Sequence, residues 1–231
     1  MSHLDITKVL YGRAARESRE GEPIKQVLAV WEEIDGAITH LLQNSDTRFQ
    51  SILERSIPII SVTTIETYYR DMLDGIFRVC SPNFYKPILN EIHKDKYDIN
   101  DLVTLHEKSI HPLEMVSVAQ NFQSVEAIEK VFSKFMKKGF WNSVLGAAVR
   151  AKEAPDQIVE IKNEYLESLR KLFKLRHELV HNPNHNLKII TEDLRDDIAA
   201  SFMVVFASDL QLNRMFHENM DDEIRETIDK A

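Results

Sequence analysis

The sequence predicts an all-α protein, an antiparallel helical bundle with a helical insertion. Only 6 glycines and 7 prolines occur in 231 residues, which is few for the many turns of a β fold. Apolar residues instead recur at spacings of three and four, as in helices with one buried face. We expect a single domain over 1–231, with its core at about 22–80 and 155–217 and the insertion at about 81–154.

Two long helices are expected in the first part of the core. The first, at 22–44, carries its apolar residues at helical spacing: Ile24, Val27, Leu28, Trp31, Ile34, Ile38 and Leu41. In the second, Pro58 and the β-branched run from Ile57 to Ile65 predict a kinked helix, with a short strand as the alternative. The sequence Ser81-Pro82-Asn83 should end this helix.

The stretch from Phe84 to Trp141 predicts shorter helices, separated by Pro87, a polar run at 95–100, Pro112 and Gly139. The next long helix is expected to begin near Pro155-Asp156, because proline and acidic residues suit a first helical turn. Asn182-Pro183-Asn184 should end it after about His181.

The last major helix should follow Thr191, a suitable N-cap residue. Its predicted buried stripe consists of Leu194, Ile198, Phe202 and Val205.

Composition indicates where the protein works. The single cysteine, Cys80, stands among apolar residues, so we expect a structural thiol in a reducing compartment. The first residues lack a basic segment followed by an apolar one, and no apolar run approaches the roughly 20 residues of a membrane helix. We therefore expect a cytoplasmic protein without a membrane partner.

The formal net charge of −8 argues against nucleic-acid binding over the whole surface. The charge is uneven, however, because the segment from Lys130 to Asn182 holds eleven basic and six acidic side chains, a net of +5. Either a local RNA-binding surface or an ordinary solvated helical surface accounts for this excess.

The segment from Leu166 to Asn182 carries the strongest chemical signal. Helical spacing places Arg176 on an apolar stripe. There it forms an ion pair with a glutamate of another helix, extends its charged end to solvent at the end of the helix, or binds an anion. His177 and His181 are four apart and project from one side of the same turn. Histidine can exchange protons near neutral pH and arginine can clamp a phosphate, although a lone histidine would more simply cap the helix end.

The sequence Arg176-His177-Glu178-Leu179-Val180-His181 resembles the signature of the HEPN superfamily, in which an arginine and a polar residue precede a histidine. The run from Ser61 to Tyr69 is similar to the first core helix of the RiboL-PSP-HEPN branch, and Thr191-Glu192-Asp193 fits the helix start that follows the motif. The resemblance covers about half of the chain, mainly 55–80 and 160–215.

The resemblance implies a HEPN-like bundle that cuts RNA without a metal or other cofactor, at a cleft between the two protomers of a homodimer. His181 would transfer protons, Arg176 would stabilise the charged phosphorane, and His177 would support both. An antitoxin or an antiviral defence protein is a candidate partner by analogy with related toxin–antitoxin systems. Regulation through a tyrosine two residues after the histidine is not implied, because Pro183 stands there.

Two other functions stay open. One is a non-catalytic HEPN module that binds nucleotides or partners, which the acidic net charge favours. The other is a zinc peptidase, since His177-Glu178-x-x-His181 matches a zinc-binding pattern and Glu192, Asp196 or Asp197 offers a third ligand. Against zinc stand the helix break at Pro183, the absence of a predicted sheet and the shortness of the pattern.

Overall fold

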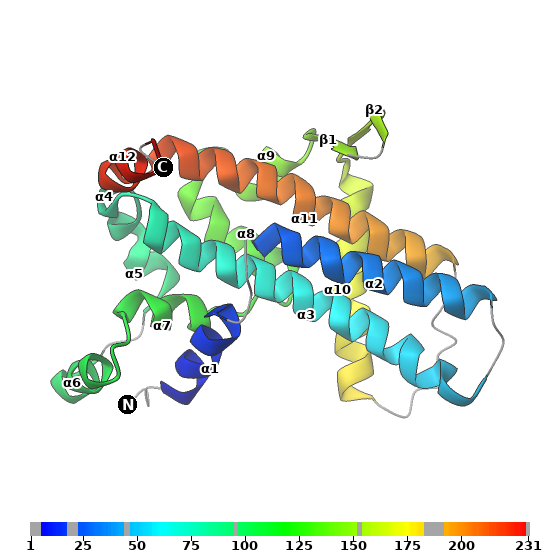
Figure 1. The fold of residues 1–231 in the computed structure, drawn as a ribbon, viewed down its shortest axis with the longest axis horizontal. Coiled ribbons are helices and arrows are strands. Elements are labelled where there is room, and N and C mark those ends of the chain that lie inside the picture. Colours follow the sequence, from blue (N-terminus) through cyan, green and yellow to red (C-terminus); the bar gives the residue numbers. More distant parts are fainter. Residues whose placement is uncertain are drawn as a thin grey trace.

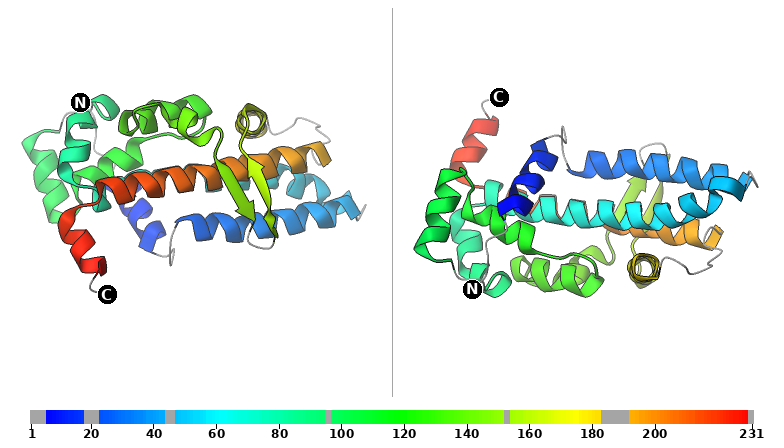
Figure 2. Two further views of the ribbon diagram at one scale, coloured as in Figure 1. Left: turned by 90° about the horizontal axis from the view of Figure 1, so that it is seen from above. Right: turned by 90° about the horizontal axis from the view of Figure 1, so that it is seen from below.

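The computed structural model describes residues 6–17, 23–43, 47–94, 97–151, 154–182 and 192–229. Three long helices, α2 (Pro23–Gln43), α3 (Thr47–Val79) and α11 (Glu192–Asn219), run side by side along the molecule (Figure 1). Helix α10 (Asn163–His181) crosses them steeply and is seen end-on in Figure 2. The predicted all-α class is confirmed.

The long helices follow the predicted apolar spacing. Helix α2 buries four residues of its expected stripe: Val27, Ile34, Ile38 and Leu41. Helix α3 continues through Pro58, so the expected helix is confirmed and the alternative strand is wrong. All four residues predicted for the stripe of α11 are buried, whereas the proposed N-cap Thr191 lies outside the described residues.

Short helices fill most of the predicted insertion, as expected, and lie from one end of the long helices to about their middle (Figure 1). They are α4 (Pro82–Tyr85), the 3-10 turn η1 (Lys86–Ile88), α5 (Leu89–Ile92), α6 (Ile99–Glu107), α7 (Pro112–Ala119), α8 (Val125–Phe132), the 3-10 turn η2 (Ser133–Phe135) and α9 (Phe140–Val144). Side chains cap three of these helices: Asp98 caps α6, His111 caps α7 and Ser124 caps α8.

A β-hairpin replaces the predicted start of α10. Strands β1 (Ala148–Ala151) and β2 (Ala154–Glu160) pair antiparallel, with Val149 opposite Val159. The predicted helix start near Pro155-Asp156 is therefore wrong, and α10 begins at Asn163. The β-branched pair Ile158-Val159 favours an extended chain, and an antiparallel partner completes the hydrogen bonding that this short segment needs.

Aromatic side chains form the centre of the core. The Tyr69 ring of α3 packs against Phe122, Phe132, Phe140 and Trp141 of the insertion. Its buried hydroxyl also forms a 2.9 Å hydrogen bond with Ser208 of α11. The core thus joins the insertion to the long helices that carry α10.

The ends of α3 and α11 are tied together by two backbone hydrogen bonds. The Ser81 amide donates to the Asn219 carbonyl and the Asp221 amide donates to the Val79 carbonyl, both at 2.9 Å. Helix α12 (Asp222–Asp229) follows this bridge.

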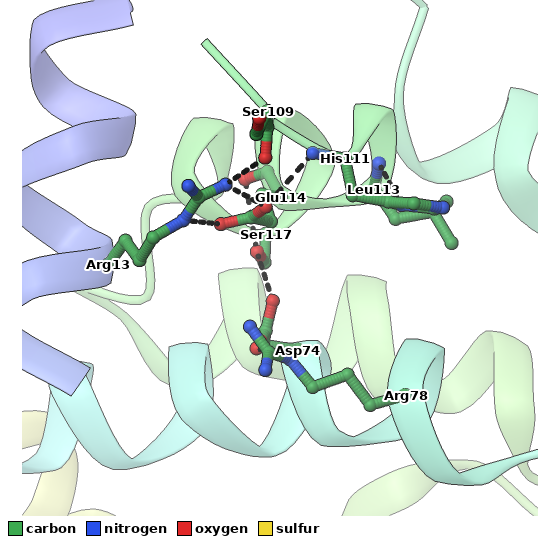
Figure 3. Close-up of polar contacts among 8 residues, drawn as sticks. All are labelled: Arg13, Asp74, Arg78, Ser109, His111, Leu113, Glu114 and Ser117. Atoms are coloured by element: carbon green, nitrogen blue, oxygen red, sulfur yellow. Dashed lines mark hydrogen bonds and ion pairs between the residues drawn. The ribbon is translucent and has the colours of Figure 1, made fainter. Parts of the chain in front are cut away.

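An additional helix, α1 (Ile6–Glu17), packs on α7 through a polar cluster (Figure 3). The Arg13 guanidinium donates to both carboxylate oxygens of Glu114, which also accepts from the His111 amide. One turn further along α7, Ser117 donates to the buried carboxylate of Asp74, which pairs with Arg78 on α3. The cluster therefore links α1, α7 and α3.

Candidate active site

Helix α10 carries all three residues selected from the sequence, Arg176, His177 and His181, in its last two turns. Its opposite end follows the hairpin, and its apolar face packs on α3 and α11. The buried residues of this face are Leu166, Leu169, Leu172, Phe173 and Leu179. The helix remains regular to its end, where the Asn182 amide donates to the Glu178 carbonyl at 2.9 Å.

Arg176 points toward the predicted insertion. Its side chain is half-buried, and its Nη1 donates to Oε1 of Gln123 at 3.4 Å. Gln123 lies between α7 and α8, in the predicted insertion. The alternative of a direct ion pair with a glutamate is not seen, since among the described residues Arg176 hydrogen-bonds to the amide of Gln123 and pairs with no carboxylate.

The Nε of Arg176 is buried and, within the part of the chain that the structure describes, has no hydrogen-bond partner. A buried donor without a partner costs roughly 1–3 kcal/mol, so such groups are rare in folded proteins. The Nε of Arg70 on α3 is a second one among the described residues. One N–H donor of the Arg176 guanidinium is therefore left without an acceptor in the described part of the folded chain.

The structure brings His177 and His181 together on the exposed side of α10. Their ring centroids are 4.4 Å apart with an interplanar angle of 51°. Both side chains are exposed, so solvent or a ligand can reach the imidazoles. Two adjacent imidazoles can act as proton donor and acceptor for one reacting group.

One chain does not aim Arg176 and His181 at the same point. The two are five residues apart, so on a regular helix their side chains leave the axis about 140° apart. Unwinding of the last turn would relax this separation, but α10 stays helical through His181. The histidines therefore face solvent while the arginine faces the insertion.

Carboxylates neutralise much of the positive charge that the sequence places along α10. Arg170 pairs with Glu126 and Glu167, and Lys171 pairs with Asp197 at 3.2 Å. These pairs lie on the turns before Arg176. The basic surface along α10 is therefore weaker than the net charge of the segment suggests.

The zinc alternative lacks a third ligand in the described structure. No group of three histidine, cysteine, aspartate or glutamate side chains suited to a metal ion occurs among the described residues. Of the three acids considered, Asp197 instead accepts a hydrogen bond from Ser168 at 2.5 Å and pairs with Lys171. The geometry thus favours the HEPN interpretation of the two histidines.

Sequence patterns did not point to two further residues near Arg176. Gln123 contacts Arg176 directly, and its Nε2 donates to Oε2 of the buried Glu66 at 3.3 Å. Glu66 stands on the apolar stripe of α3, and that position is a signal that could have identified it. Gln123 lies in a loop without periodicity, and nothing in its local sequence marks it.

These elements define an all-helical protein with a histidine pair and an inward arginine at the end of one core helix. The family model for RiboL-PSP-HEPN matches residues 28–213, so the chain belongs to this HEPN family. Comparisons with curated proteins and with solved structures returned no significant match. Among the described helices, none combines the length and apolar character needed to span a membrane. Family membership points to a ribonuclease or an RNA-binding module.

Proposed function

We propose that the protein is a metal-independent endoribonuclease whose site consists of Arg176, His181 and His177. The observation that carries this proposal is the exposed imidazole pair, with ring centroids 4.4 Å apart, at the end of α10, on the same helix as a guanidinium whose buried Nε has no hydrogen-bond partner in the described chain. The family assignment provides the context, because the matched range includes all three residues.

In the proposed reaction, the ribose 2′-oxygen attacks the adjacent phosphorus while the bond from phosphorus to the 5′-oxygen breaks. The proton of the 2′-hydroxyl passes to a base, and a second proton passes to the departing 5′-oxygen. The products are a 2′,3′-cyclic phosphate and a 5′-hydroxyl. His181 transfers protons, supported by His177, and such a group contributes roughly 10²–10⁴ to the rate. Arg176 stabilises the charged phosphorane.

The working unit in this proposal is a homodimer with α10 at its interface. Because Arg176 and His181 diverge by about 140° on one helix, a second copy is the simplest way to bring an arginine and a histidine to one phosphate. A twofold axis places the same patch of both chains in contact, so the arginine of one chain can approach the histidine of the other.

The test is cleavage of a 5′-labelled RNA oligonucleotide in the presence of a metal chelator, with mass analysis of the product ends. We expect cleavage to persist with the chelator and to leave cyclic phosphates. Arg176→Ala and His181→Ala should each abolish cleavage with an unchanged helical circular dichroism spectrum. Arg214→Ala and His217→Ala are matched controls, since both residues are exposed on α11, and they should cleave normally.

Other outcomes separate the alternatives. RNA binding without cleavage by the wild-type protein would support a non-catalytic module. Peptidase activity that the chelator removes would support the zinc site. Either result would contradict the proposed ribonuclease.

A further inference from the structure

Gln123 occupies a fixed place between two anchored neighbours. Phe122 is fully buried and packs against Tyr69 and Phe132 in the aromatic core. Ser124 caps α8 by accepting from the Ala127 amide at 3.1 Å. The backbone of Gln123 is therefore held from both sides, and its half-buried side chain reaches α10 from a rigid base.

The side-chain amide of Gln123 connects Arg176 with Glu66. Its Oε1 accepts from Nη1 of Arg176 at 3.4 Å, and its Nε2 donates to Oε2 of Glu66 at 3.3 Å. Only this orientation of the amide satisfies both neighbours, because a guanidinium can only donate and a carboxylate can only accept. Glu66 is 7% exposed and lies 4.0 Å from Nη2 of Arg70, so it cannot move away freely.

A neutral amide orients Arg176 without cancelling its charge. A carboxylate at the same place would form an ion pair and compete with a phosphate for the guanidinium. Here the negative charge of Glu66 stays one side chain away, on the far side of the amide. The buried Nε of Arg176 has no hydrogen-bond partner in the described chain.

We propose that Gln123, anchored by Glu66, is a positioning residue that aims the Arg176 guanidinium at the scissile phosphate. This inference rests on the proposed ribonuclease function and deepens it. Gln123 touches Arg176 and not the RNA. The insertion thus supplies part of the site that α10 alone does not contain.

The test replaces Gln123 with methionine, which has a similar length but accepts hydrogen bonds only weakly and cannot donate one to Glu66. We expect kcat to fall roughly 10- to 100-fold, because a misplaced catalytic group loses rate on this scale, while KM changes little.

A matched control separates positioning from damage to the loop. Gln120→Met alters a glutamine of the same segment that donates to the Ile92 and Val116 carbonyls and does not contact Arg176 in the structure. It should keep wild-type kcat. Gln123→Glu is a second variant of similar size that can still accept from Arg176. It should also lose kcat, because it pairs with the guanidinium and places a second carboxylate beside Glu66.

A second readout does not depend on cleavage. The ¹⁵N NMR signal of the Arg176 Nε–H group, assigned by its loss in Arg176→Ala, should shift in Gln123→Met and stay unchanged in Gln120→Met. Unchanged kcat and an unchanged signal in Gln123→Met would overturn the inference, as would an equal loss in Gln120→Met. If the wild-type protein cuts no RNA, the proposed ribonuclease function is wrong. A shifted signal in Gln123→Met would still show that Gln123 positions the Arg176 side chain.

Discussion

Arg13 of α1 and Glu114 of α7 are joined by two hydrogen bonds, of 2.6 and 3.0 Å, between guanidinium and carboxylate (Figure 3). The side chains are 24% and 8% exposed, so water screens this pair poorly. We expect Arg13→Ala to lower the free energy of unfolding by roughly 1–3 kcal/mol, because the buried carboxylate loses its charged partner. Urea unfolding followed by circular dichroism measures this change.

Arg214→Ala is the control for this measurement. Arg214 pairs with Glu218 one turn away, but the two side chains are 75% and 59% exposed. Removal of such a surface pair should change the free energy of unfolding by about 0.5 kcal/mol or less. Equal effects of the two replacements would show that the contact between Arg13 and Glu114 does not stabilise the fold.

The Tyr69 hydroxyl should contribute less to stability than the Tyr69 ring. Tyr69→Phe removes only the hydrogen bond to Ser208 and should lower the free energy of unfolding by about 1 kcal/mol. Tyr69→Ala also leaves a cavity among the aromatic rings and should lower it by roughly 3–5 kcal/mol. Thermal and urea unfolding can distinguish these two decreases in the free energy of unfolding. Tyr11 is exposed, so Tyr11→Ala is a control that should change the free energy of unfolding little. If Tyr69→Phe and Tyr69→Ala lowered the free energy of unfolding by similar amounts, the hydroxyl would contribute more to stability than we expect.

Complementation in trans tests the proposed dimer. A mixture of Arg176→Ala and His181→Ala chains should regain about a quarter of wild-type cleavage, because half of randomly exchanged dimers contain one intact composite site of two. Each variant alone should stay inactive. An inactive mixture whose subunits demonstrably exchange, or a wild-type monomer with full activity, would rule out a shared site.

Burial raises the pKa of the Cys80 thiol to about 11. At pH 8 only about one thiol in a thousand is then ionised, and the thiolate is the reactive form. We expect iodoacetamide to modify Cys80 slowly in the folded protein and rapidly in urea, as followed by mass spectrometry. Equal rates in both states would show that this cysteine is not protected.

Local patterns were sufficient to predict the long helices. The apolar spacing of α2, α3 and α11 reflects one buried face along each helix, which is visible without knowledge of the partner. The β-hairpin was missed because Pro155 and Asp156 suit a helix start as well as an extended segment. The choice depends on pairing with β1, which is a contact between segments and not a property of either one.

The three candidate residues of the site lie within six positions of one helix, so the sequence alone selects them. Gln123 is 53 residues before Arg176, and Glu66 is a further 57 residues before Gln123. No local spacing connects residues so far apart. Their contact exists because the aromatic core holds the insertion against α10.

The sequence by itself determined the all-α class, the residues of the Arg176 and His181 motif and the resemblance to a family, because helix periodicity and short motifs are encoded within a few turns of chain. The tertiary structure decided the environment of the motif. It turned Arg176 toward the neutral amide of Gln123, left His177 and His181 on the exposed side, and neutralised the basic residues before them. Each of these outcomes depends on which side chains from distant parts of the chain pack against α10. The local sequence of α10 does not specify these contacts.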